Sequence, residues 1–367
     1  MHLENLSLIQ FKNYTECDLS LSPKLNCFIG NNGAGKTNIL DAVYYLSFCK
    51  SFFNHVDQHN IRYGDDFFVI QGQYERLEKP EQIYCGVKRN QKKVFKRNKK
   101  EYGKLSEHIG LFPLVMISPY DTGLIHEGSE ERRKFIDGVI SQFDAEYLHQ
   151  LIRYQQVLNQ RNKLLKEPNA VRHAATFEVY NQQLDSYGHF IHQRRQSFLD
   201  EIIPVFQSTY TELSLDREEV SLQYHSPLHQ KRLADLLEEN FSKDLVLQYT
   251  SKGIQKDDLL FELNGHSLRK SGSQGQQKTF LISLKLAQYA YMAEKIGLKP
   301  LLLLDDLFDK LDSDRVERII QKVSRNSFGQ IFITDTNKHR ISALLKKYTG
   351  SHHLFEVDKG AVVLKEE

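Results

Sequence analysis

One eight-residue segment constrains the fold more than any other part of the 367-residue chain. It reads Gly30-Asn31-Asn32-Gly33-Ala34-Gly35-Lys36-Thr37 and matches the pattern GxxxxGK[ST]. It follows an apolar run, Leu25 to Ile29, and precedes a helical pattern, Asn38 to Phe48. In this context successive N–H groups and the helix N-terminus bind a triphosphate, which a chance glycine-rich turn does not explain. We predict that all eight residues bind nucleotide, with Lys36 at the β- and γ-phosphates and Thr37 on Mg²⁺.

Two acidic residues are suited to hold the metal ion from the opposite side. The run Leu301 to Leu304 is typical of a buried strand and ends in Asp305 and Asp306. Ligands bind at the carboxyl ends of strands in open α/β sheets, so we expect both acids beside the phosphate loop. We predict Asp305 as a second Mg²⁺ ligand and Asp306 as the general base for the attacking water. Without the phosphate loop, a solvated acidic turn is the better interpretation.

A third segment indicates the ABC-type branch of ATP-binding proteins. Gly272-Ser273-Gln274-Gly275-Gln276 at the start of a predicted helix resembles the ABC signature. In that class the serine, glycine and helix N-terminus contact ATP held by the opposite subunit, so ATP bridges a head-to-tail dimer. We therefore predict Ser273, Gly275 and Gln276 as nucleotide contacts made in trans. The alternative is a plain helix cap, in which Ser273 satisfies free N–H groups.

The middle of the chain has a different pattern from its two ends. Between Ser129 and Leu213, apolar residues keep helical spacing and glycine is scarce, and Pro168 and Asn169 interrupt the pattern. We predict an antiparallel helical hairpin, with its aromatic stripes packed as core. Strand patterns return at Glu219 to Tyr224, Leu259 to Leu263 and Gln330 to Thr334.

The expected fold is α/β: a P-loop NTPase of the ABC-ATPase type with a mainly helical inserted second domain. Two lobes agree with the length, since single cores rarely grow beyond about 250–300 residues. We expect a discontinuous ATPase domain, residues 1–118 and 215–367, and an insertion, residues 119–214.

Charge and cysteine usage restrict the function classes only loosely. The chain has 49 Lys and Arg residues and 47 Asp and Glu residues, so its net charge alone does not indicate a nucleic-acid partner. The cysteines Cys17, Cys27, Cys49 and Cys85 form no CxxC pair, which favours neither zinc nor disulfides. No signal peptide or membrane span is recognisable, and we expect a cytoplasmic protein.

Taken together, the motifs resemble the RecF family of bacterial recombination-repair ATPases. The resemblance rests on the order of the phosphate loop, Ser273 to Lys278 and Leu302 to Asp312, and on three further segments. These are Leu8 to Tyr14, Glu131 to Asp137 with the pattern RRxFxD, and Gln160 to Leu165 with the pattern QRNxLL. Lys310-Leu311-Asp312 is similar to the D-loop of ABC dimers.

The resemblance implies a weak, DNA-stimulated ATPase that uses ATP and Mg²⁺ and dimerises on ATP. It also implies binding to single-stranded and gapped duplex DNA with little sequence specificity, and work with RecR and RecO in loading recombinase at gaps. Two other classes of protein contain the same type of ATPase domain: a nucleotide-binding subunit of a transporter and an SMC-like structural protein. The long insertion disfavours the first, and the lack of a long coiled-coil arm disfavours the second.

Three features of the sequence depart from the expected motifs. The segment Gly253-Ile254-Gln255-Lys256-Asp257-Asp258 stands where the family carries a Gly-Pro-His-Arg-Asp-Asp type sequence. Thr334 stands where transporter ATPases place a histidine. No Q-loop glutamine is identifiable near Ser118 to Asp121.

The basic stretch Lys88 to Lys100 reads as a hairpin and favours contact with the DNA backbone. A sheet edge protected by lysines against aggregation explains the same pattern equally well.

Overall fold

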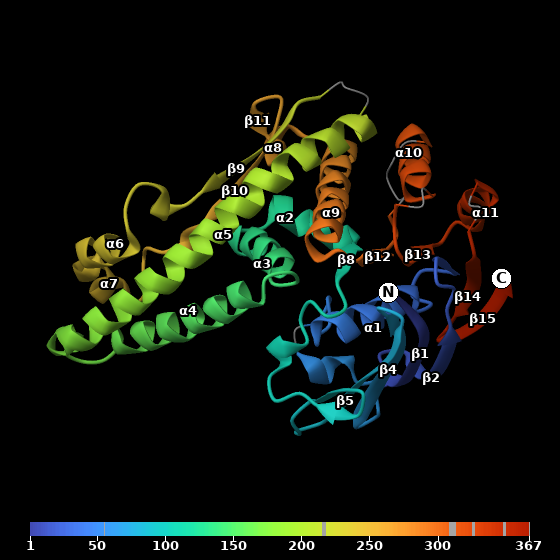
Figure 1. Cartoon of the computed structure of the whole chain (residues 1–367), viewed down its shortest axis with the longest axis horizontal. Helices are drawn as coiled ribbons and strands as arrows, with labels where there is room; N and C mark the ends of the chain where they lie inside the picture. The colour runs from blue at the N-terminus through green and yellow to red at the C-terminus, as the bar shows by residue number, and fades with distance from the viewer. Residues whose placement is uncertain (55, 215–217, 308–312, 325–326, 348–349, 367) are drawn as a thin grey trace. The chain divides into compact units, whose positions relative to one another are not determined.

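The computed structural model describes residues 1–54, 56–214, 218–307, 313–324, 327–347 and 350–366. By its internal contacts the chain divides into two compact units. Unit 1 comprises Met1–Asp121 and Leu281–Glu367, and unit 2 comprises Thr122–Phe280. In Figure 1, unit 1 holds the blue and red segments with both chain ends, and unit 2 runs from green to orange.

Unit 1 contains an antiparallel sheet with the strand order β2-β1-β4-β5-β6-β7 among the described residues. Its strands are β1 (His2–Phe11), β2 (Tyr14–Ser20), β4 (Phe67–Arg76), β5 (Lys79–Lys88), β6 (Val94–Arg97) and β7 (Lys100–Glu101). In β1, Leu6 and Leu8 lie on the same face of the strand and are buried, as the two-residue period of a strand requires.

A second, mainly parallel sheet of unit 1 has the order β15-β14-β3-β13-β12-β8 in the described part of the chain. Its strands are β3 (Leu25–Ile29), β8 (Leu114–Ile117), β12 (Leu301–Leu304), β13 (Ile331–Asp335), β14 (His352–Asp358) and β15 (Ala361–Glu366). Strand β15 runs antiparallel to β14, and the other neighbours are parallel. Strands β3, β8, β12 and β13 are buried at every position, as continuous apolar runs in parallel sheets require.

One hydrophobic core joins the two sheets of unit 1 and the helix α1 (Lys36–Phe48). It includes Ile39 and Val43 of α1, Phe68 of β4 and Leu303 of β12. Unit 1 also contains η1 (Asp57–Asn60), η2 (Leu105–Glu107), α10 (Ser313–Ser324) and α11 (Lys338–Lys347). This core therefore packs around β3 and α1, the two elements that flank the phosphate-loop segment.

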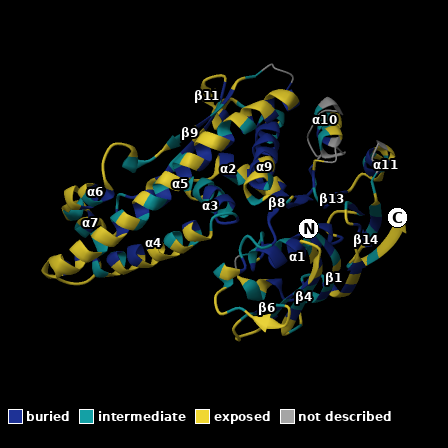
Figure 2. Cartoon of the chain, viewed as in Figure 1, coloured by how far each residue is buried: buried dark blue, intermediate teal, exposed yellow. Residues whose placement is uncertain are grey.

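Unit 2 is built around the predicted helical hairpin, which the structure confirms. Its helices are α4 (Ala145–Leu164) and α5 (Ala174–Ser214), preceded by α2 (Gly123–His126) and α3 (Ser129–Ile140). The break falls at Pro168 and Asn169, where Asn169 has a φ of 62° before η4 (Ala170–His173). Figure 2 shows buried positions along α5 in dark blue. Phe177, Leu184 and Ile191 of this helix are buried, in agreement with a hairpin whose apolar stripe packs as core.

The remainder of unit 2 is a small sheet with short helices. Strands β9 (Val220–His225), β10 (Asp258–Leu263) and β11 (His266–Ser267) have the order β11-β10-β9. The other elements are η5 (Pro227–His229), α6 (Leu233–Glu239), α7 (Phe241–Leu247), η6 (Ile254–Lys256) and α8 (Leu268–Ser271). Helix α9 (Gln274–Ile296) begins in unit 2 and continues into unit 1, and η3 (Pro119–Thr122) lies at the other junction.

The first predicted domain boundary, 118/119, lies near the contact-based division between Asp121 and Thr122, whereas the second, 214/215, lies far from the division between Phe280 and Leu281. Residues 218–280 belong by contacts to unit 2, because β9 and β10 pack on α5 and α3. The signature segment therefore lies in unit 2. No helix among the described residues is long and apolar enough to cross a bilayer.

Candidate nucleotide-binding site

The phosphate loop needs glycine at defined positions. Gly33 and Gly35 have φ angles of 77° and 118°, which L side chains rarely adopt. A Cβ atom on Gly35 would lie 2.4 Å from Asn13 Nδ2, and one on Gly30 would lie 2.2 Å from the Val357 carbonyl oxygen. Gly30 and Gly35 are thus fixed by close approach of other segments, a reason that the sequence motif alone does not give.

Residues from both ends of the chain donate hydrogen bonds to carbonyl groups of this loop. The Asn13 amide donates to the Ala34 carbonyl at 3.0 Å, and the Tyr14 hydroxyl donates to the Gly35 carbonyl at 3.0 Å. The Gly360 N–H, in the turn between β14 and β15, also donates to Ala34 at 3.1 Å. Asn13 and Tyr14 fall within a segment of the family resemblance, but no local pattern pointed to Gly360.

Several backbone N–H groups of the loop are available as hydrogen-bond donors to a ligand. Within the described residues, the backbone N–H groups of Gly33, Gly35, Lys36 and Thr37 donate to no protein acceptor. The Lys36 ammonium donates to the carbonyls of Gly30 at 2.8 Å and Asn31 at 3.0 Å. Burial lowers the pKa of Lys36, and the carboxylates of Asp306, Asp305 and Asp335 act in the opposite direction. Donors on one concave backbone surface suit a polyphosphate.

The predicted metal ligands meet at the carboxyl edge of the parallel sheet. The Thr37 hydroxyl donates to Asp305 Oδ1 at 2.9 Å, and the Thr334 hydroxyl donates to the same oxygen at 2.8 Å. The Asp306 N–H donates to Thr334 Oγ1 at 3.0 Å. Burial raises the pKa of Asp305, against the hydrogen bonds from Thr334 and Thr37 that lower it. Thr334 therefore orients the two acids, a role that sequence reasoning missed.

These side chains fit ATP and Mg²⁺. Thr37 and Asp305 supply hard oxygen ligands from two elements, as Mg²⁺ sites with substrate phosphates do. Asp306 has a φ of 42°, which marks the turn where β12 ends beside the loop. The roles of Lys36, Asp305 and Asp306 in catalysis stay predictions.

The signature segment has the geometry of a capped helix. The Ser273 N–H donates to Gln276 Oε1 at 2.7 Å, and the Gln276 N–H donates to the Ser273 hydroxyl at 3.3 Å, which is a capping box. Gln276 also donates to Glu218 at 2.8 Å. Ser273 is exposed. The helix-cap interpretation is therefore correct as local structure, and it leaves the helix start accessible to a ligand. Contacts of Ser273, Gly275 and Gln276 with nucleotide stay predictions.

Two predicted elements give less information. The D-loop candidate, Lys310-Leu311-Asp312, lies outside the described residues. Ser118 to Asp121 follows β8, and the Asp121 carboxylate forms an ion pair with Lys285 at 2.8 Å. No glutamine takes part there, so a Q-loop residue stays unassigned.

The basic stretch forms the predicted hairpin, and part of its charge is committed internally. Lys93 forms an ion pair with Asp57 at 2.8 Å and donates to the Cys49 carbonyl at 2.6 Å. Arg97 pairs with Glu81. The exposed cations are Lys88, Arg89, Lys92, Lys99 and Lys100. These five are the most accessible candidates in the stretch for contact with a phosphate backbone, and Lys96 is half-buried over the Tyr84 ring.

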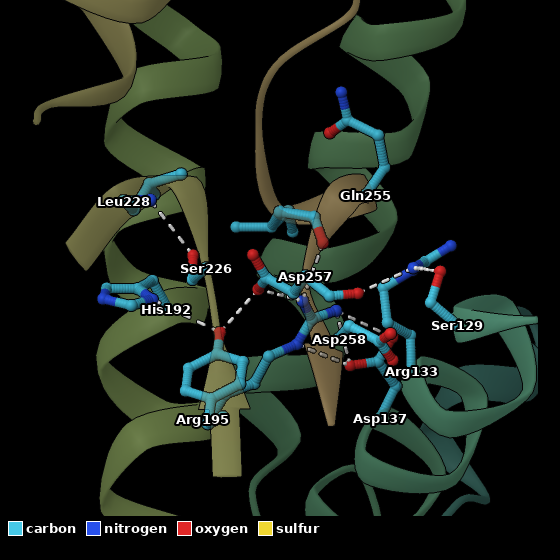
Figure 3. Close-up of polar contacts among 12 residues, drawn as sticks. Ser129, Arg133, Asp137, His192, Arg195, Ser226, Leu228, Gln255, Asp257 and Asp258 are labelled. Atoms are coloured by element: carbon cyan, nitrogen blue, oxygen red, sulfur yellow. Dashed lines mark hydrogen bonds and ion pairs between the residues drawn. The ribbon is translucent and has the colours of Figure 1, made fainter. Parts of the chain in front are cut away.

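The RRxFxD segment forms a buried polar cluster with the segment that departs from the family pattern (Figure 3). Arg195 of α5 contacts Asp137 at 2.9 Å and Asp257 at 2.7 Å. Arg133 donates to the Asp257 carbonyl at 2.7 Å, and the Tyr224 hydroxyl donates to the Asp257 carboxylate. Gln255, where the family has histidine, accepts from the Tyr154 hydroxyl at 2.6 Å. Gln255 thus makes a polar contact between α4 and η6.

The QRNxLL segment forms a second buried contact farther along the hairpin. Arg161 and Asp244 are both fully buried and form an ion pair at 2.8 Å. Arg161 also donates to Thr250 at 2.7 Å, and Asn162 accepts from the Thr250 N–H at 2.8 Å. This segment anchors α7 and the following loop to α4.

A P-loop between the parallel strand β3 and α1, acids at the end of β12 one strand beyond the neighbouring β13, and an antiparallel sheet joined to the same core define an ATPase of the ABC type. The sequence matches the family described as RecF/RecN/SMC N terminal domain over residues 2–353. It is 50% identical to the DNA replication and repair protein RecF of Flavobacterium johnsoniae, over 97% of this chain and 100% of that protein. The chain belongs to the RecF family.

Two further comparisons agree. A RecF of Bacteroides fragilis is 49% identical over 100% of this chain and 99% of that protein. A solved structure of the recombination mediator protein RecF with ATP, from the RecFOR pathway, has a TM-score of 0.88 and 28% identity. It covers 100% of this chain and 98% of that chain.

Proposed function

We propose that this protein acts in DNA replication and repair as an ATP-dependent DNA-binding switch. The proposal rests mainly on the hydrogen bonds of Thr37 and Thr334 to Asp305, beside the phosphate loop that carries Lys36. Names of relatives at 50% and 49% identity over nearly the whole chain support the repair role.

In this proposal the loop N–H groups and Lys36 bind the phosphates of ATP, and Thr37 and Asp305 hold Mg²⁺. A Mg²⁺ ion held by these two side chains would supply charge neutralisation at the phosphates. Asp306 accepts a proton from the attacking water. Turnover is slow, and the protein works with RecO and RecR at single-strand gaps, in line with the pathway named for the solved relative.

DNA contact is proposed for the five exposed cations of the hairpin. All five are exposed; of the five, Arg89 also lies 3.8 Å from the exposed carboxylate of Asp66 and donates to the Asp65 carbonyl at 3.1 Å. Binding to phosphates by such groups is salt-dependent and largely blind to sequence.

The first test is ATP hydrolysis without DNA and with single-stranded, duplex and gapped duplex DNA. We expect stimulation by DNA, greatest with the gapped form. Asp306→Asn should bind ATP but hydrolyse it at least about a hundredfold more slowly, as loss of a general base requires. Turnover indifferent to every DNA would count against the switch. Unchanged turnover in Asp306→Asn would remove the base assignment.

The second test concerns the signature. Ser273→Arg places a long cation at an exposed helix start. It should spare ATP binding, because the phosphate loop lies in the other unit, and it should abolish ATP-dependent dimers. Sedimentation velocity with and without ATP measures this. Normal dimers in the variant would exclude Ser273 from a nucleotide site completed in trans.

A further inference from the structure

We propose that Arg132 is a positioning residue for the signature: it fixes two segments of unit 2, one that leads along the chain into the signature helix and one that contacts its first turn. The inference rests on the proposed ATP-dependent dimer. It gives the RRxFxD segment a role in setting dimer affinity, in addition to packing.

The Arg132 guanidinium connects three elements. From α3 it donates to both carboxylate oxygens of Asp258, at 2.7 and 3.2 Å, where β10 begins. Its Nη1 donates to the carbonyls of Leu124 at 2.9 Å and Glu127 at 3.1 Å, in and just after α2. The side chain is 13% exposed. A planar fork with five donors can make this arrangement, whereas a lysine ammonium cannot reach both sides at once.

Both segments lead to the signature. Strand β10 continues through β11 and α8 directly into Gly272. Helix α2 carries His126, whose ring lies 2.9 Å from Gln277 Oε1 in the first turn of α9. The Gln277 amide in turn donates to the carbonyls of Gly272 at 3.0 Å and Leu268 at 3.3 Å. A shift of either segment would therefore move the start of α9.

The same strand is also tied to the long helix of the hairpin. Asp257, next to Asp258, is held by Arg195 of α5, and Arg195 is 1% exposed (Figure 3). At its C-terminal end α5 is followed by Glu218, which accepts from the signature residue Gln276 at 2.8 Å. The position of α5 and the position of the signature are thus coupled through β10. Contiguous side-chain contacts of this kind can couple the positions of the elements that they join.

The variant Arg132→Gln removes the ion pair with Asp258 and cannot bridge to both carbonyls. We expect the ATP-dependent dimer to weaken about tenfold, within the range of such coupling. ATP affinity of the monomer, measured by equilibrium dialysis at low protein concentration, should stay unchanged. Arg132→Lys should give an intermediate dimer affinity, because it keeps the charge pair alone. Asp258→Asn tests the same contact from the other side and serves if Arg132→Gln does not fold.

Lys134→Gln is the matched control. Lys134 lies on the same helix, forms exposed ion pairs with Glu130 and Glu131, and contacts neither segment. It should dimerise like the wild type.

Ser273→Arg separates failure of the inference from failure of the proposed function. If Ser273→Arg dimerises normally, the trans site itself is wrong. If Ser273→Arg abolishes dimers while Arg132→Gln and Asp258→Asn dimerise like Lys134→Gln, the positioning role is overturned. It is also overturned if dimer affinity falls only in step with thermal stability across all these variants.

Discussion

Lys36→Ala is expected to eliminate ATP hydrolysis and to weaken ATP binding by about 10- to 150-fold, the loss of roughly 1.5–3 kcal/mol for a hydrogen bond to a charged group. The ammonium lies at the phosphate loop, held only by the carbonyls of Gly30 and Asn31 among its described hydrogen bonds. Its removal takes away a cation that the phosphates need. The loop should keep its conformation, because Asn13, Tyr14 and Gly360 donate hydrogen bonds to its carbonyl groups.

Equilibrium dialysis with ATP and a phosphate-release assay measure the two quantities. Lys79→Ala, at the exposed start of β5 in the same unit, is the control and should behave as wild type. Far-UV circular dichroism tests that both variants are folded. Wild-type turnover in Lys36→Ala would contradict the assigned site.

Asp244→Ala is expected to destabilise unit 2 by about 3–5 kcal/mol, because it leaves the buried Arg161 charge without its carboxylate. Both side chains are 0% exposed, and the remaining partners of Arg161, Thr250 and Asn181, are neutral. Urea denaturation followed by circular dichroism measures the loss, since the chain contains no tryptophan for fluorescence.

Two comparisons make this result specific. Glu131→Ala removes an exposed ion pair with Lys134 and should cost no more than about 1 kcal/mol. The double variant Arg161→Met with Asp244→Leu removes both charges together and should recover part of the loss. A loss below about 1 kcal/mol in Asp244→Ala would show that the pair does not hold α7 and its loop as inferred.

Local patterns predicted the elements whose signal is contained in a short segment. The phosphate loop between β3 and α1, the buried strand β12 with its acids, and the α4–α5 hairpin all have a period or a motif within about 20–40 residues. The long strands β4 and β5 and the hairpin β14–β15 were not predicted. Phe68, Ile70 and Tyr74 of β4 do alternate and are buried, so that signal was present and overlooked.

The sequence by itself determined the family and predicted the chemistry: a triphosphate loop, a metal carboxylate and a helix start of the signature type. Tertiary structure alone decided what holds them. Gly360 reaches Ala34, Thr334 orients Asp305, and Arg132 joins Asp258 to α2, across separations that no local period encodes. The physical reason is that a motif specifies which groups face a ligand through backbone geometry nearby. The position of that backbone depends on hydrogen bonds and packing between segments that meet only when the chain is folded.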